Sequence, residues 1–206
     1  MTKLPAVILA GGLARRMGGG DKGLLTLGHQ PILSHVIDRL APQAAPLAIN
    51  ANGDPARFHP YGLPVLADGI DGFPGPLAGV LAGLDWAAEL GATAIVTVAA
   101  DTPFFPRDLA QTLTASAARE GHAIALAATP HAERGSVRHP TFGLWPTALR
   151  DDLRAALADG VRKVVAWTDR HGAATALFDA GDIDPFFNVN TPEDLDLARS
   201  LLATAP

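Results

Sequence analysis

Short apolar runs alternate along the chain with segments whose apolar residues recur at the spacing of a helix. The apolar runs predict strands at residues 5–10, 46–50, 63–68, 92–101, 122–129, 141–146 and 174–179. The helical spacing predicts helices at residues 31–43, 75–90, 106–119, 147–157 and 192–203. Strands that alternate with helices indicate an α/β fold with a doubly wound, mostly parallel sheet and helices on both faces. In such folds, ligands bind beyond the carboxyl ends of the strands.

Two segments toward the C-terminus have distinctive local signals. The start of the last helix is predicted by an N-cap residue, Thr191, followed by a first-turn proline, Pro192. Two acids, Glu193 and Asp194, then lie near the positive end of the helix dipole. Residues 131–140 are mostly polar, and we expect a mobile loop there.

Composition limits the class of protein. The 206 residues suffice for one sizeable core, so we expect a single domain over residues 1–206. The formal charge of −5 argues against nucleic-acid binding, which needs a basic face. No apolar run reaches the roughly 20 residues that span a bilayer, and the first is shorter than the roughly 7–15 of a signal peptide. The chain has no cysteine, which excludes disulfides, thiolate nucleophiles and cysteine-ligated metals. Together these features lead us to expect a cytoplasmic protein that binds neither nucleic acid nor membrane.

A glycine-rich, locally basic loop follows the first predicted strand. Residues 9–23 read LAGGLARRMGGGDKG and set Arg15, Arg16 and Lys22 against the single acid Asp21. Glycines let backbone N–H groups approach a phosphate, and the basic side chains can bind its oxygens. The segment matches neither the P-loop nor the dinucleotide-binding pattern. A surface loop with stray basic residues is the alternative.

Polar residues end three of the predicted strands. Asn50, Asp68 and Asp101 should therefore meet the glycine-rich loop at one edge of the sheet. An aspartate that follows a buried strand is well placed to hold Mg²⁺, which takes one or two carboxylates together with substrate phosphates. Asp101 could instead cap the next helix, although Thr102 or Asp108 is better placed for that role. Asn50 and Asp68 could simply terminate their strands.

Other polar residues give weaker signals. The seven histidines show no metal-binding pattern, and His139, next to Pro140, suits a structural role better than catalysis. Residues 188–190, Asn-Val-Asn, could form a turn or contact a second polar substrate. No nucleophile elbow or Ser-His-Asp spacing is visible.

The motifs together resemble a known family. The segment LAGGLARRMGGGDKGLL is similar to the signature loop of nucleotidyltransferases, and its Gly-Gly and Asp-Lys pairs resemble the molybdenum cofactor guanylyltransferases of the MobA type. Further matches follow in order along nearly the whole chain: NAN at 50–52, FPGPLAG at 73–79, AADTPFFPRDL at 99–109, RHPTFGLW at 138–145 and FFNVNTPEDL at 186–195. The combination is specific, whereas any one piece alone is not.

The resemblance implies a single nucleotidyltransferase domain with a Rossmann-like fold of the nucleotide-diphospho-sugar transferase type. It implies transfer of GMP from GTP to molybdenum-molybdopterin with Mg²⁺ and release of pyrophosphate. Contact with proteins of molybdopterin synthesis and molybdoenzyme maturation is also implied. The residues it places at the nucleotide are Leu9, Ala10, Gly11, Gly12, Lys22, Asn50, Asp68 and Asp101. Lys22, Asp101 and Arg16 take the catalytic roles, with Asp101 also binding the metal. Residues 188–190 and the segment of His139 fall where the pterin substrate is handled.

Three other functions remain open at this level. A CTP-dependent molybdopterin cytidylyltransferase shares the fold. Such relatives usually carry LAAG, however, and Gly12 together with Asp21 favours a guanylyltransferase. A sugar-phosphate nucleotidyltransferase fits less well, given the short chain and the middle motifs. A non-catalytic carrier of nucleotide or cofactor is the third, and the presence of Lys22 and Asp101 argues against it.

Overall fold

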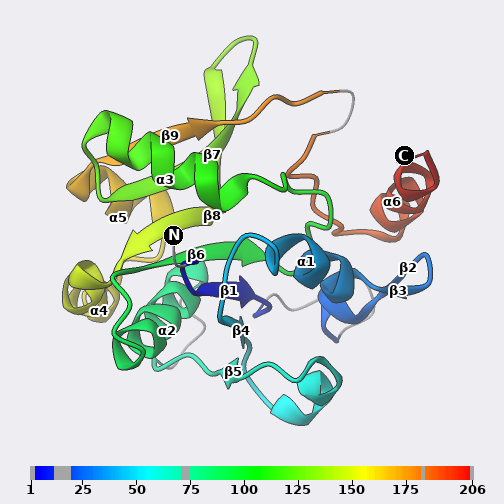
Figure 1. The fold of residues 1–206 in the computed structure, drawn as a ribbon, viewed down its shortest axis with the longest axis horizontal. Coiled ribbons are helices and arrows are strands. Elements are labelled where there is room, and N and C mark those ends of the chain that lie inside the picture. Colours follow the sequence, from blue (N-terminus) through cyan, green and yellow to red (C-terminus); the bar gives the residue numbers. More distant parts are fainter. Residues whose placement is uncertain (1–2, 12–19, 71–74, 182–183, 205–206) are drawn as a thin grey trace.

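The computed structural model describes residues 3–11, 20–70, 75–181 and 184–204, and within them the chain forms an α/β fold around a central sheet (Figure 1). The sheet in these ranges has seven strands in the order β5-β4-β1-β6-β8-β7-β9. The strands are β1 Ala6–Leu9, β4 Leu47–Asn50, β5 Val65–Leu66, β6 Ala94–Ala99, β7 Ile124–His131, β8 Gly135–Pro146 and β9 Ala173–Leu177. All neighbours pair in parallel except β8, which runs antiparallel to both β6 and β7. The predicted fold class, a mostly parallel α/β sheet, is confirmed.

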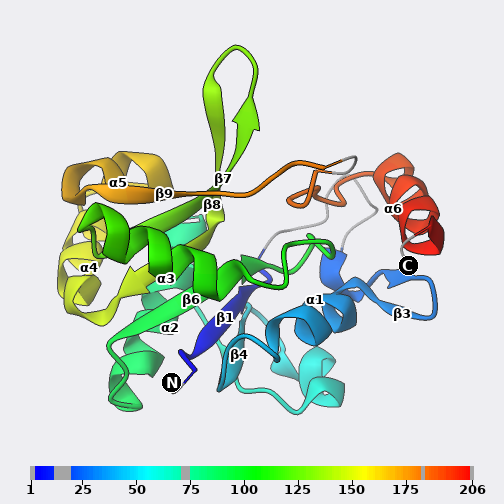
Figure 2. The same ribbon diagram turned by 45° about the horizontal axis from the view of Figure 1, so that its top comes forward.

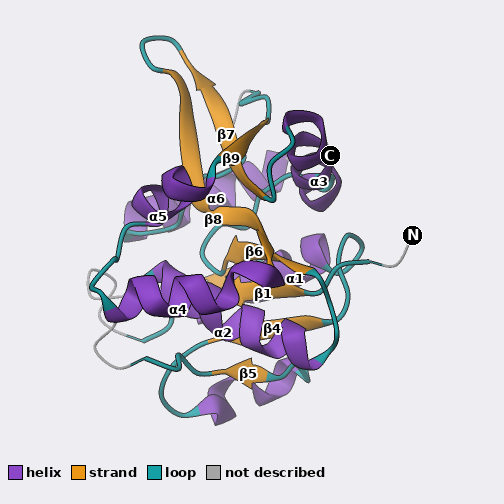
Figure 3. Cartoon of the chain, turned by 90° about the vertical axis from the view of Figure 1, so that its left-hand side faces the viewer, coloured by secondary structure: helices purple, strands orange, loops and turns teal. Residues whose placement is uncertain are grey.

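Helices cover both faces of the sheet (Figures 2 and 3). The helices are α1 Ile32–Leu40, α2 Pro76–Glu89, α3 Leu109–Glu120, α4 Arg150–Ala158, α5 Val164–His171 and α6 Pro192–Thr204. Helices α1, α3 and α6 contribute to the hydrophobic core on one face, and α2, α4 and α5 to the core on the other. Burial on both faces explains the continuous apolar runs that mark the central strands in the sequence. None of the helices in the described part of the chain is long and apolar enough to span a membrane.

Several short elements lack a clear sequence signal. These are the hairpin of β2 Thr26–Leu27 and β3 Gln30–Pro31, and the 3₁₀ turns η2 Lys22–Leu24, η3 Pro55–Tyr61 and η4 Thr147–Leu149. Helix α5 also lacks a clear sequence signal. Its Trp167 is fully buried against Trp145, so tertiary packing rather than helical periodicity defines it.

The start of the last helix agrees with its predicted capping. The Asp194 N–H donates to Thr191 Oγ1 at 3.2 Å, and Asp194 Oδ2 accepts from the Thr191 N–H at 2.9 Å. This reciprocal pair satisfies backbone donors at the helix start, with aspartate in the place usually held by glutamate.

The expectation of a loop at residues 131–140 is wrong. Strands β7 and β8 continue into this segment as a hairpin that projects from the body of the protein (Figure 3). Thr129 pairs with Val137 and His131 with Gly135, so the polar side chains belong to a two-stranded ribbon. Residues 130–135 are exposed and residues 136–140 are only partly buried, so no buried apolar face leaves an alternating pattern, and the sequence reads as loop.

A register shift sets the projecting part of the hairpin apart from the sheet. Leu126 of β7 pairs with Gly143 of β8, but the next residue, Ala127, pairs with His139. The extra β8 residues lie around Pro140, which has no N–H to donate to a neighbouring strand. This irregularity places Thr141 at the carboxyl edge of the sheet, where it lines the cavity described below.

A buried hydrogen-bond chain joins β6 to the antiparallel strand β8. The Trp145 indole donates to Thr97 Oγ1 at 2.8 Å, and the Thr97 hydroxyl donates to the Thr141 carbonyl at 2.9 Å. Both Thr97 and Trp145 are 0% exposed, so neither indole nor hydroxyl can turn to water instead. The two strands are therefore held by side chains as well as by their ladder.

We predict that Thr97→Val lowers the free energy of unfolding by about 1–3 kcal/mol, because it leaves the buried Trp145 N–H without an acceptor. Chemical denaturation followed by tryptophan fluorescence measures the change. Thr97→Ser is the control: it keeps the hydroxyl and loses one methyl, so its cost should be about 1 kcal/mol. A loss for Thr97→Val no larger than the loss for Thr97→Ser would show that the hydrogen bond contributes little to stability.

Candidate active site

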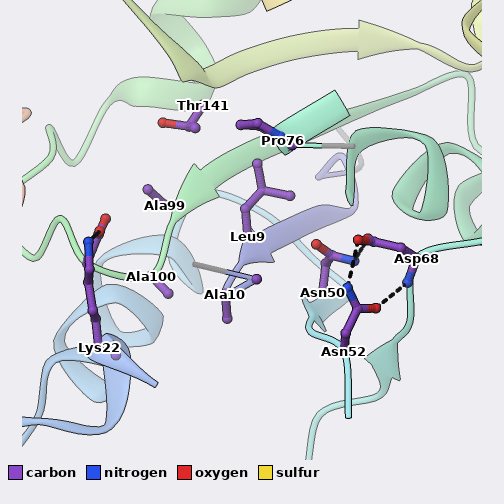
Figure 4. A pocket seen from close by; sticks show the side chains of 14 residues that line it. Leu9, Ala10, Lys22, Asn50, Asn52, Asp68, Pro76, Ala99, Ala100 and Thr141 are labelled. Carbon is purple, nitrogen blue, oxygen red and sulfur yellow. Dashed lines mark hydrogen bonds and ion pairs between the residues drawn. The ribbon is translucent and has the colours of Figure 1, made fainter. Parts of the chain in front are cut away.

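A cavity of about 420 Å³ opens at the carboxyl edge of the parallel strands (Figure 4). The residues that line it come from the ends of β1, β4 and β6, from the segments that follow β1, β4, β5 and β6, from the start of α2, and from β8. They are Leu9, Ala10, Gly11, Lys22, Gly23, Asn50, Asn52, Asp68, Gly75, Pro76, Ala99, Ala100, Asp101 and Thr141. The cavity therefore lies where the topology of an open α/β sheet places ligands.

The floor of the cavity is the backbone at the ends of β1 and β6. Leu9 and Ala99 lie side by side in the parallel register, so both strands leave the sheet at the same level. The Ala100 N–H donates to the Leu9 carbonyl at 3.1 Å, and the Ala10 N–H donates to the Asn50 carbonyl at 2.8 Å. These bonds fix the backbone of residues 9–11 at the cavity.

One side of the cavity carries a lysine that contacts two distant parts of the chain. Lys22 Nζ donates to Asp101 Oδ2 at 3.3 Å and to Asn190 Oδ1 at 2.5 Å. The Lys22 and Asp101 side chains are 18% and 21% exposed, so both are partly shielded yet reachable from the cavity. An ammonium has three donors, so two acceptors leave one hydrogen to meet a ligand.

The segment before α6 packs directly on the residues that follow β6. The Val189 N–H donates to the Asp101 carbonyl at 2.9 Å, and Val189 is fully buried. The Thr102 hydroxyl donates to Asn188 Oδ1 and also lies 3.4 Å from Asp101 Oδ1. Residues 188–190 therefore do more than form a turn, because they hold both the backbone of Asp101 and the ammonium of Lys22.

The opposite side of the cavity carries two amides and a carboxylate (Figure 4). Asn50 Nδ2 donates to Asp68 Oδ1 at 2.9 Å, and Asn52 Nδ2 donates to Asp68 Oδ2 at 2.8 Å. Asn52 Oδ1 accepts from the Asp68 N–H at 2.9 Å, so one asparagine binds both the backbone and the side chain of Asp68. Both carboxylate oxygens of Asp68 are held by amides, which fixes the orientation of an acceptor that lines the cavity.

A glycine of α2 makes room for this amide–carboxylate group. A Cβ at Gly79 would lie 2.2 Å from Asn50 Oδ1 and 2.8 Å from Leu9 Cδ2. Asn50 itself is only 4% exposed. The helix can therefore pack this close to the ends of β1 and β4 only because position 79 has no side chain.

His139 lies in the projecting hairpin rather than in the cavity lining. Its ring stacks on Phe186 at a centroid distance of 4.3 Å, and Nε2 lies 2.9 Å from Thr129 Oγ1. Burial lowers the pKa of His139, and the nearby charge of Asp184 partly opposes that shift. These contacts agree with the structural role expected for it.

The structure brings most of the predicted residues together. The cavity described above is lined by seven of them: Leu9, Ala10, Gly11, Lys22, Asn50, Asp68 and Asp101. Gly12 and Arg16 lie outside the described residues. Sequence reasoning missed Asn52 as a site residue and also missed Thr141. Asn52 stands two positions after Asn50, a spacing that places both side chains on one side of an extended segment. Thr141 had no comparable signal.

Comparison with known proteins agrees with this geometry. A cavity at the carboxyl edge of such a sheet is typical of nucleotide-binding α/β proteins. The chain belongs to the MobA-like NTP transferase domain family, whose model matches residues 6–174. Two similar proteins are molybdenum cofactor guanylyltransferases. That of Bradyrhizobium sp. (strain ORS 278) is 53% identical over 205 residues, covering 98% of this chain and 94% of that protein. That of Cereibacter sphaeroides is 53% identical over 200 residues and covers 97% of each chain.

Solved structures show the same fold at lower sequence identity. The molybdopterin-guanine dinucleotide biosynthesis protein A of Archaeoglobus fulgidus superimposes with a TM-score of 0.74 at 20% identity, covering 98% of this chain and all of that one. A CMP:2-keto-3-deoxy-manno-octonic acid synthetase complexed with CTP gives a TM-score of 0.70 at 13% identity, covering 97% of this chain and 98% of that one. The expected nucleotide-diphospho-sugar transferase type of fold is thus confirmed.

We predict that Gly79→Ala lowers the free energy of unfolding by about 1–3 kcal/mol, because the added methyl overpacks against Asn50. It should also weaken nucleotide binding, since Asn50 must move. Thermal unfolding and titration calorimetry measure the two effects.

Gly83→Ala in the same helix is the matched control. Its Cβ would lie 2.8 Å from Ile95 Cδ1 and from Val7 Cγ2, which are apolar atoms on the core face. It should destabilise the fold while leaving nucleotide affinity unchanged. A comparable loss of affinity in both variants would contradict a specific role for the contact between Gly79 and Asn50.

Proposed function

We propose that this chain transfers GMP from GTP to molybdenum-molybdopterin, forming molybdopterin guanine dinucleotide and releasing pyrophosphate. The observation that carries the proposal is the pairing of opposite chemistries across one cavity. Lys22 and Asp101 lie on one side, and Asn50, Asn52 and Asp68 on the other. Family membership supports the same activity.

The amide–carboxylate side suits the nucleoside part of GTP. The Asp68 carboxylate can only accept hydrogen bonds, so it selects donors such as ribose hydroxyls or the amino group of guanine. Its two amide contacts hold it in place before the ligand arrives, which lowers the entropic cost of binding. We assign the backbone of residues 9–11 to the stretch between the nucleoside and the phosphates.

The lysine side suits the triphosphate. Lys22 supplies a cation with a hydrogen to spare beyond its contacts to Asp101 and Asn190. Arg16 and Gly12 belong to the same expected phosphate-binding loop and remain a prediction from the sequence.

Asp101 fits a magnesium site. Mg²⁺ binds through one or two carboxylates together with substrate phosphates and water, so a single partly exposed carboxylate at the cavity is an adequate protein ligand. The described residues hold no cluster of three acids or histidines that could bind a metal unaided, which favours a metal that arrives with the nucleotide. Bound there, the ion would neutralise phosphate charge during transfer.

The reaction needs few catalytic groups from the protein. The terminal phosphate of molybdopterin is ionised near neutral pH and attacks the α-phosphorus of GTP directly, so no general base is required. The barrier lies in bringing two anions together and in releasing pyrophosphate. Lys22 stabilises the negative charge on the phosphates, and the fixed backbone and Asp68 hold the nucleotide in line for attack. This division of roles accounts for a site without a cysteine or serine nucleophile. We place the reaction in the cytoplasm.

The test is a transfer assay with purified protein, Mg²⁺, molybdenum-loaded molybdopterin and either GTP or CTP. We expect pyrophosphate release and dinucleotide formation with GTP, little with CTP, and none when Mg²⁺ is chelated. Faster transfer from CTP would assign the chain to the cytidylyl reaction instead. Tight binding of GTP without pyrophosphate release would support a carrier.

We predict that Lys22→Ala and Asp101→Asn each lower kcat/KM by about 10²–10³-fold, the size typical for loss of one charge-stabilising group. Steady-state kinetics with GTP measures this effect, and circular dichroism checks that the variants fold. Lys163→Ala, which removes an exposed lysine at the start of α5, is the control and should keep full activity. A near-normal kcat/KM for either site variant would contradict its assigned role.

A further inference from the structure

An acidic residue, Asp21, lies directly beside the proposed phosphate-binding lysine, and binding of phosphate does not explain why an acid is there. Asp21 is the one negative residue among Arg15, Arg16 and Lys22 in the glycine-rich loop, and it directly precedes the lysine. Its side chain is 18% exposed and stands at the start of η2, the turn that carries Lys22. A free carboxylate here would attract the neighbouring ammonium and repel a triphosphate.

Arg57 of η3 binds this carboxylate. Arg57 Nε donates to Asp21 Oδ2 at 2.5 Å, and Nη2 lies 3.4 Å from Asp21 Oδ1. Such two-point contact between a guanidinium and a carboxylate is stronger and more directional than a lysine contact. The pair is partly buried, with side chains 27% and 18% exposed, so it is screened less than an ordinary surface ion pair.

The other donors of Arg57 hold it to the second side of the cavity. Nη2 donates to the Asn52 carbonyl at 2.6 Å, and Nη1 donates to the Asp54 carbonyl. The guanidinium carbon lies 4.6 Å from the ring centroid of Phe58, which is 1% exposed. Every nitrogen of the guanidinium therefore has an acceptor, and the group is fixed in place against a core residue.

Arg57 thus contacts residues from both sides of the cavity, the lysine side and the amide–carboxylate side, although it does not line the cavity itself. Through Asp21 it reaches the residue before Lys22, and through Asn52 it reaches the side chain that holds Asp68. A residue in this position acts on a ligand only through its partners.

We propose that Arg57 is a positioning residue that occupies the Asp21 carboxylate and thereby leaves Lys22 free to bind the phosphates of the nucleotide. The inference rests on the proposed function, because it needs a nucleotide whose phosphates lie at Lys22. In the absence of Arg57, the Asp21 carboxylate adds its unpaired charge to the site and competes for the ammonium.

The experiment compares binding of GTP, GDP and GMP to the wild type and to Arg57→Gln by titration calorimetry in the presence of Mg²⁺. We expect Arg57→Gln to weaken GTP binding roughly tenfold, the scale of one partly screened charge interaction. The loss should shrink from GTP to GDP to GMP as the number of phosphates falls. An equal loss for all three ligands would overturn the proposal in favour of a merely structural role.

Removal of the carboxylate provides the decisive rescue. We expect the double variant Asp21→Asn/Arg57→Gln to bind GTP more tightly than Arg57→Gln alone, because no charge is left uncompensated. No recovery would overturn the proposal. Asp21→Asn alone should bind GTP at least as tightly as the wild type, and this arm stands even if Arg57→Gln does not fold. A tenfold loss in Asp21→Asn would instead assign the carboxylate a direct contact with nucleotide or metal.

Arg154→Gln is the matched control. Arg154 Nη2 pairs with Asp85 Oδ1 at 2.6 Å between α4 and α2, away from the cavity lining. Its removal should leave all three affinities unchanged. A wild-type protein that binds no GTP would overturn the proposed function and this inference together. Normal GTP binding by both the wild type and a folded Arg57→Gln would overturn this inference alone.

Discussion

The ammonium of Lys22 joins three parts of the chain that are far apart in sequence. It donates to Asp101, which follows the central strand β6, and to Asn190, which lies just before the last helix. Asp101 is fixed in turn by the backbone of Val189. The site depends on this contact, because it aligns the proposed phosphate-binding cation with Asp101, which among the described residues is the carboxylate that lines this side of the cavity.

Much of the fold could be predicted from the sequence, since buried parallel strands leave continuous apolar runs and helices leave their own periodicity. The errors occur where exposure removes that signal. The tip of the hairpin of β7 and β8 is exposed at residues 130–135 and only partly buried at residues 136–140, and most of its residues are polar, so residues 131–140 read as loop. Helix α5 is short, and the burial of Trp167 defines it better than any spacing of apolar residues does.

Asn50, Asp68 and Asp101 could be predicted to meet at one edge of the sheet, because each ends or follows a parallel strand and ligands bind beyond the carboxyl ends of such strands. What the sequence could not give is the pairing of side chains across that edge. The contacts of Asn52 with Asp68, and of Arg57 with Asp21, arise from loops whose conformation no periodic pattern specifies. The resemblance to a family pointed to many of the same residues, but not to the contacts that orient them.

The hydrogen bond between Lys22 and Asn190 closes a loop of 168 residues, which is most of the polypeptide. Contacts of such separation carry a high loop-closure entropy and form late unless other structure has already brought their ends together. The matched family model ends at residue 174, ahead of this asparagine. All seven described strands of the sheet end by Leu177, so a nascent chain that stops short of Asn190 already contains them, but its Lys22 lacks one of its two hydrogen-bond acceptors.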